Sequence, residues 1–234
     1  MLAIYKREMR AYFTTPIGYV FAAIFLSLSA ALFCYTTLYA LSADVTQYFT
    51  MMLIAFMVLL PLLTMKTLSE ERKTKTEQLL LSAPVSLTGM ICAKFLAAFT
   101  VFFGCVLLTS LNFIILYTHA QPNTAVILGS LLALILVGMA FIAIGIFVSA
   151  LTESQLAASV ITVAILLSLL VISFANSLIA APWLRFILSG LSVFSRFQNF
   201  TNGIFDVAAL VYYLSLTAVF LFLTVRVYDH RRYA

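Results

Sequence analysis

The stretch KTLSEERKTKTEQLLLSAPVSLTGMICAK, residues 66–94, interrupts a sequence that is otherwise almost entirely hydrocarbon. It holds five of the 13 lysines and arginines and three of the eight aspartates and glutamates. We therefore expect a water-facing segment between two membrane-spanning helices. A plain connector needs only a few residues. The length of this charged segment, and its end in Leu79–Leu81 and Pro84, predict a surface that a cytosolic partner binds. The alternative is a solvated loop.

The spacing of polar residues predicts a short helix within this segment, over residues 67–81. Thr67 or Ser69 is placed to cap its first turn, where the carboxylates that follow suit the positive end of the helix dipole. Pro84 then stops the helix. The pairs expected to meet at helical spacing are Glu70 with Lys73 and Glu71 with Lys75.

The composition on either side of this segment is that of an integral membrane protein. Hydrophobic residues make up 64% of the 234-residue chain and charged residues 9%, against about 25% charged residues in soluble domains. A membrane span needs about 20 apolar residues. The third charge-free run is long enough for two spans and the others for one each, which predicts a single all-α domain of six spans over residues 1–234. The five longest charge-free runs are 11–43, 45–65, 95–152, 154–184 and 207–225.

The net charge of +5 is distributed as membrane topology requires, so it does not indicate a nucleic-acid partner. With both termini in the cytoplasm, only Arg185 and Arg196 face outward, and this asymmetry fits the positive-inside rule. We expect a multi-pass protein of the bacterial cytoplasmic membrane. The eleven cytoplasmic cations are then Lys6, Arg7, Arg10, Lys66, Arg72, Lys73, Lys75, Lys94, Arg226, Arg231 and Arg232.

The N-terminal residues 1–15 have the two-faced pattern of a helix lying in the membrane interface. Leu2, Tyr5 and Met9 recur at helical spacing, while Lys6 and Arg10 take the other side. Pro16 ends this helix, and the alternative is an ordinary basic flank of the first span.

Short turns separate the later spans. Residues 151–155 form a tight inner turn, in which Thr152 and Gln155 have the spacing of a capping box, and the turn offers a second cytosolic contact surface. Three glycines in the preceding span are available for close helix packing. They are Gly129, Gly138 and Gly145. The spans are expected at about 17–41, 48–65, 90–117, 125–150, 155–180 and 207–225.

Residues 181–205 are too polar for a clean crossing and too aromatic for a free loop. They predict an outer, partly re-entrant hairpin of short helices whose aromatic side chains lie at the membrane interface; the alternative is an amphipathic surface loop. The residues expected to define it are Trp183, Phe194, Arg196, Phe197 and Phe200.

The sequence lacks the motifs expected of an ATPase or of an ion-driven transporter. No glycine is followed by lysine, so there is no phosphate-binding P-loop. No charged residue is expected deep in any span, which argues against a proton or sodium relay. We expect no catalytic, cofactor-binding or metal-binding residues and infer that the chain is no enzyme, with energy supplied by another polypeptide.

Three strings resemble the permeases of ABC-2 (type V exporter-like) transporters. Residues 70–86, EERKTKTEQLLLSAPVS, are similar to their cytoplasmic coupling segment. Residues 149–159, SALTESQLAAS, and 200–226, FTNGIFDVAALVYYLSLTAVFLFLTVR, resemble the gliding-motility-associated branch of GldF type. The likeness covers nearly the whole chain and extends to its order of parts.

This resemblance implies a permease subunit of an ATP-driven exporter. Two such chains, as a homodimer, would dock on separate ATP-binding subunits that hold ATP and Mg, and an extracytoplasmic auxiliary protein would meet the outer hairpin. A rival interpretation is a non-transporting scaffold or mechanotransmitting module that an ATPase drives. The coupling segment 66–88 and the inner turn would contact the ATPase through Glu70, Glu71, Arg72, Lys73, Lys75, Leu79, Thr152, Glu153 and Gln155.

Overall fold

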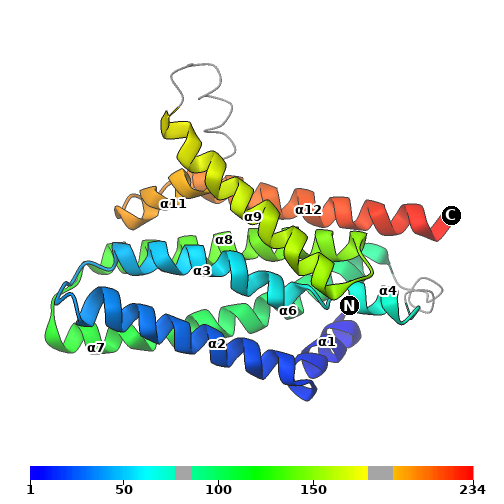
Figure 1. The fold of residues 1–234 in the computed structure, drawn as a ribbon, viewed down its shortest axis with the longest axis horizontal. Helices are drawn as coiled ribbons and strands as arrows, with labels where there is room; N and C mark the ends of the chain where they lie inside the picture. The colour runs from blue at the N-terminus through cyan, green and yellow to red at the C-terminus, as the bar shows by residue number, and fades with distance from the viewer. Residues whose placement is uncertain (77–85, 179–191, 234) are drawn as a thin grey trace.

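The computed structural model describes residues 1–76, 86–178 and 192–233, and these residues form a bundle of long helices (Figure 1). Within these ranges, six helical segments are long and apolar enough to cross a membrane, so the expectation of six spans is confirmed. The segments are Pro16–Leu38, Thr46–Lys73, Leu87–His119, Thr124–Leu151, Gln155–Phe174 and Val207–Arg231.

Helix α8 (Thr124–Leu151) is the centre of the bundle. In its most apolar stretch 72% of the residues are buried, whereas the corresponding value for α9 and for α12 is 22%. Because it is apolar on all sides, α8 can pack against neighbours in every direction. The helices that contact it include α3 (Thr46–Thr64), α6 (Leu87–Thr109), α9 (Gln155–Leu178), α11 (Val193–Thr201) and α12 (Val207–Tyr233).

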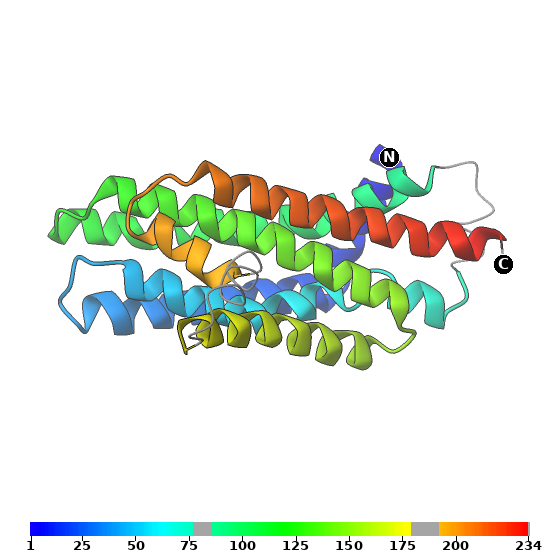
Figure 2. The same ribbon diagram turned by 90° about the horizontal axis from the view of Figure 1, so that it is seen from above.

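Both ends of the chain lie at the same end of the bundle. Figures 1 and 2 show the N-terminal helix α1 (Leu2–Thr14), the short helix α4 (Ser69–Lys73) and the end of α12 together there. We call this the charged end. Helix α7 (Leu111–His119) and the 120–123 loop lie at the opposite end.

Helix α1 is an independent helix, as residues 1–15 predict. Thr15 is extended (φ −92°, ψ 152°), the conformation favoured before a proline, and Pro16 occupies the first turn of α2 (Pro16–Phe33). The corner is tight: a β-carbon on Gly18 would lie 2.4 Å from the Tyr12 carbonyl oxygen. The sharp corner fixes how α1 leaves the bundle.

Two spans differ in detail from the expected single helices. The first continues past α2 as one turn of π-helix, Cys34–Leu38. The third breaks at Ser110 into α6 and α7. At this break the hydroxyls of Thr109 and Ser110 donate to the carbonyls of Val106 and Leu107, three residues back, which competes with the regular helical pattern.

Helix α11 corrects the picture of an interfacial aromatic hairpin. Phe197 and Phe200 are fully buried, and Phe194 is nearly so, because α11 packs against α8 and α9. Arg196 lies over the ring of Tyr212, 4.4 Å from its centroid. Trp183 lies outside the described residues, as does the first limb of the expected hairpin.

The three glycines singled out in α8 all permit close packing, and a β-carbon on Gly129 would lie 3.2 Å from the Phe200 carbonyl oxygen. A β-carbon on Gly138 would lie 2.2 Å from Cζ of the buried Phe102 ring, and one on Gly145 would lie 2.2 Å from Thr64 Oγ1. Phe102 in turn contacts Phe25 and Phe56 edge-to-face. The bare backbone of α8 therefore admits side chains from α3 and α6 into the centre of the bundle.

We expect Gly138→Ala to lower the free energy of unfolding by about 1–3 kcal/mol, because the buried Phe102 ring cannot move aside. Gly104→Ala in α6 is the matched control, since its β-carbon would meet no atom within 4 Å, and it should leave stability unchanged or slightly raised. Denaturant titration of both variants in detergent measures the difference. Equal stability of the two variants would contradict the close packing.

Candidate functional site

The helix expected over residues 67–81 is shorter in the structure and is capped differently. Helix α4 covers Ser69–Lys73, and Leu68 is its N-cap. The hydroxyls of Thr67 and Ser69 donate backward, to the carbonyls of Thr64 and Met65. The prediction that either of them caps the helix is therefore wrong. Leu79–Leu81 and Pro84 lie outside the described residues.

The cap of α4 comes from another helix, through Ser149 of α8. Its Oγ accepts from the backbone N–H groups of Leu68, at 3.1 Å, and Ser69, at 3.0 Å. The same hydroxyl lies 3.3 Å from the Met65 carbonyl, to which it donates. Free N–H groups at a helix start need such an acceptor. One buried serine thus attaches α4 to the central helix.

The inner turn is also attached to α4, through Arg72. Its guanidinium donates to the Leu151 carbonyl at 2.9 Å and lies 3.1 Å from the Glu153 carboxylate. Arg231 donates to the neighbouring Ala150 carbonyl at 2.8 Å. Cations at the C-terminal carbonyls of a helix are favourably placed. The two segments predicted to contact an ATPase therefore lie side by side at the end of α8.

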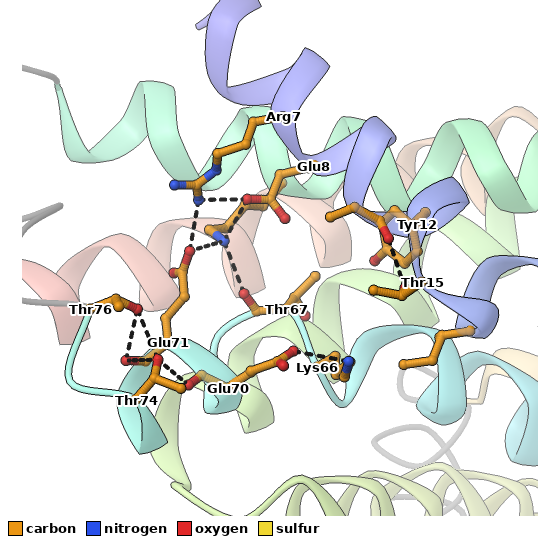
Figure 3. Close-up of a pocket in the computed structure, with 13 residues that line it drawn as sticks. Arg7, Glu8, Tyr12, Thr15, Lys66, Thr67, Glu70, Glu71, Thr74 and Thr76 are labelled. Atoms are coloured by element: carbon orange, nitrogen blue, oxygen red, sulfur yellow. Dashed lines mark hydrogen bonds and ion pairs between the residues drawn. The ribbon is translucent and has the colours of Figure 1, made fainter.

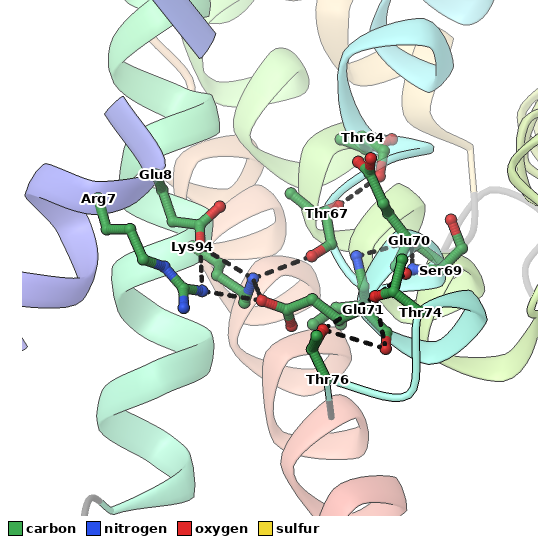
Figure 4. A network of polar contacts seen from close by, with 12 residues as sticks. Arg7, Glu8, Thr64, Thr67, Ser69, Glu70, Glu71, Thr74, Thr76 and Lys94 are labelled. Carbon is green, nitrogen blue, oxygen red and sulfur yellow. Dashed lines mark hydrogen bonds and ion pairs between the residues drawn. The ribbon is translucent and has the colours of Figure 1, made fainter. Parts of the chain in front are cut away.

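Lys94 of α6 is the centre of the polar network at the charged end (Figure 4). Its ammonium donates to Glu71 Oε1 at 2.8 Å, Thr67 O at 3.0 Å and Glu8 Oε1 at 3.1 Å. The side chain is 1% exposed, although the sequence predicts a water-facing lysine. A buried ammonium is tolerated when all three of its hydrogen bonds are made.

Arg7 completes this network from the solvent side. Its guanidinium lies 2.8 Å from the same oxygen of Glu8 and of Glu71 that binds Lys94. The hydrogen bond with Glu8 is the main cause of a raised pKa for Arg7. Two cations and two carboxylates give a network of no net charge, contributed by α1, α4 and α6.

The ion pairs expected within the 67–81 helix do not form as predicted. Glu70 pairs with Lys66, 3.3 Å away, and the Glu71 carboxylate points to Lys94 and Arg7. The helix has already ended at Lys75, which has a positive φ of 57°. Lys73 and Lys75 are exposed and form no ion pair within the part of the chain that the structure describes.

The capping box expected in the inner turn is also wrong. Thr152 donates back to the Val148 carbonyl at 3.4 Å. Ser154 instead precedes α9, and its Oγ accepts from the Ala157 N–H at 3.4 Å. Gln155 is the first residue of α9. The turn lies where the sequence places it, but its hydrogen bonds are different.

A cavity of about 430 Å³ opens between α1 and the α3–α4 segment (Figure 3). Its wall combines the charged network with Tyr12, whose hydroxyl donates to the Leu63 carbonyl at 3.3 Å. Burial raises the pKa of the Tyr12 phenol, so this hydroxyl stays protonated as a donor. The cavity separates α1 from α4 except at the ion pairs.

Sequence reasoning missed Glu8, Lys94 and Ser149 as members of this site. A signal was present for Lys94: Ile91, Ala97 and Ala98 stand three and four residues from it, so its helix face is apolar, and all three are buried. No comparable local signal marks Ser149, because its partners are about 80 residues away in sequence.

The family model for the ABC-2 family transporter protein matches residues 36–227. The chain belongs to the ABC-2 transporter family. It is therefore a multi-pass membrane component of an ABC transport system, and the family implies an ATP-binding ABC partner. Members of this ABC-2 family are membrane components without an ATPase site of their own. None of the curated proteins compared with this chain matches it.

We expect Lys94→Met to lower the free energy of unfolding by about 3 kcal/mol, because it leaves Glu8 and Glu71 facing each other without the buried cation. Lys66→Met is the matched control: Lys66 is 26% exposed and pairs with the partly exposed Glu70, so its loss should cost below about 1 kcal/mol. Adding Glu71→Gln to Lys94→Met should recover part of the loss. Additive effects in this double-mutant cycle would contradict a shared network.

Ser149→Ala should cost about 1–3 kcal/mol, since two buried N–H groups lose their acceptor. Hydrogen exchange offers the direct measurement: the amides of Leu68 and Ser69 should exchange faster in the variant. Ser168→Ala is the control, because that hydroxyl bonds only within α9. Unchanged protection at Leu68 and Ser69 would show that Ser149 is not their cap.

Proposed function

We propose that this chain is the permease subunit of an ATP-driven ABC-2 exporter and that α4, together with the 151–155 turn, is the docking surface for the ATP-binding subunit. One observation carries the proposal: Arg72 joins the two segments into a continuous surface. Lys73 and Glu153 are exposed on it. A rigid partner that touches both segments would move them together.

The contacts of α4 give such a surface a route into the bundle. Ser149 attaches it to α8, and Glu71 attaches it to α6 through Lys94 and to α1 through Arg7. A displacement of α4 would therefore act on three helices at once. This is the property required of a coupling segment when the energy source is a separate subunit.

The remaining parts of the proposal concern the assembly. The partner subunit would hold ATP and Mg, and the charged end with both termini would face the cytoplasm of a bacterial cell. A second copy would pack on the spans α2 and α9, whose exposed apolar residues include Val20, Ile24, Val160 and Val171. The GldF-type strings favour the gliding-motility-associated branch and an auxiliary protein at the α11 end.

The rival function, a non-transporting module driven by an ATPase, uses the same docking surface. The two are separated by a transport assay, because only an exporter moves a substrate in step with ATP hydrolysis. The exporter is favoured by the ABC-2 family match over residues 36–227.

We expect Lys73→Gln/Lys75→Gln to weaken binding of the ATP-binding subunit by roughly tenfold, the effect of losing about 1.4 kcal/mol of contact energy. The measurement is co-purification of the complex in mild detergent, with the partner identified by its P-loop and its ATPase activity recorded. Both lysines are exposed, so the variant should fold normally.

Lys6→Gln/Arg10→Gln is the matched control. It removes the same charge from exposed positions on α1, so it should leave the yield of the complex unchanged. If the Lys73/Lys75 variant retains full affinity and ATPase stimulation, α4 is not the docking surface. If no P-loop protein accompanies the wild-type chain, the proposed function fails.

A further inference from the structure

A second hollow lies between α1 and α6, away from the charged network. It is an apolar groove of about 330 Å³, which we call the α1/α6 groove. It follows α6 over the eight residues 93–100, a length of about 10 Å, beginning in the second turn of this membrane span. Its lining residues are Met1, Leu2, Tyr5, Ala93, Leu96 and Thr100.

The polar atoms of the groove bond to one another. The Tyr5 hydroxyl donates to Thr100 Oγ1 at 3.1 Å, and that hydroxyl donates to the Leu96 carbonyl at 2.7 Å. Both hydroxyls in the wall are thus already hydrogen-bonded within the protein. The groove therefore suits a hydrocarbon chain. It is accessible from outside the bundle at Leu96, whose side chain is 47% exposed.

Two cations of α1 follow the groove residue Leu2 along the helix surface. Lys6 and Arg10 follow Leu2 at intervals of four residues, so the three share one row of the helix surface. Both cations are exposed, and neither takes part in an ion pair with any other described residue. The only acid of α1, Glu8, is already bound to Arg7 and Lys94. This row therefore keeps two uncompensated positive charges.

We propose that the α1/α6 groove binds an anionic phospholipid of the surrounding membrane, with an acyl chain along α6 and its phosphate at Lys6 and Arg10. Charge complementarity argues for this occupant, because Leu2, which lines the apolar groove, is also the first residue of the row that carries the two cations. A basic residue near a membrane surface contributes about 1 kcal/mol toward anionic lipid. The site is independent of the docking surface for the ATP-binding subunit.

Native mass spectrometry of the full chain in detergent tests this site, with phosphatidylglycerol and phosphatidylcholine of identical acyl chains as probes. The wild-type chain should bind phosphatidylglycerol about 25-fold more tightly, or about fivefold for each cation. Lys6→Gln/Arg10→Gln should abolish this preference. Lys73→Gln/Lys75→Gln, which changes net charge equally, should retain it.

The groove itself is tested by Leu96→Trp, which fills it at a half-exposed position and should weaken binding of both lipids. Lys6→Arg/Arg10→Lys should bind as the wild-type chain does, which distinguishes lost charge from lost folding. Equal binding of the two lipids by the wild-type chain would overturn the proposal. So would displacement of bound lipid by glycerol phosphate alone, because that would indicate a phosphate site in which the acyl chain has no part.

Discussion

The structure of the charged end depends on the burial of one ammonium group. Lys94 lies inside the bundle, where an unpaired charge would cost several kcal/mol, so carboxylates must be brought to it. They come from Glu8, 86 residues earlier, and Glu71, 23 residues earlier. Meeting this requirement fixes α1 and α4 against α6 and sets the shape of the charged end.

The central helix imposes a second constraint of a different kind. Helix α8 carries no charge and is apolar on all sides, so it packs in the middle of the bundle and places the ends of other helices around its own C-terminus. Its last residues then accept hydrogen bonds from α4, from Arg72 and from Arg231. A partner pressing on α4 would thus act on the helix with the most neighbours, which is the physical basis of the coupling proposed for this ABC-2 family chain.

Helix α1 has one side that packs on the bundle and one side that is exposed. One side of it is tied to the bundle by Glu8 and by the buried Tyr12, and the other side presents Lys6, Arg10 and the exposed Leu2. A helix held in this way can be positioned by membrane lipid on one side and by α4 on the other. The proposed lipid contact and the ion pairs at the charged end therefore involve different residues of α1.

The sequence by itself determined the class of fold, the six spans and the break before Pro16, because these follow from local hydrophobicity and from proline chemistry. The strings that resemble ABC-2 permeases predicted the family correctly. Only the tertiary structure decided which groups pair: Ser149 caps α4 in place of Thr67 or Ser69, Glu71 binds Lys94 in place of Lys75, and Phe197 and Phe200 pack inside. These contacts join residues far apart in the chain. A local pattern states which groups need partners, but the packing of helices alone selects them.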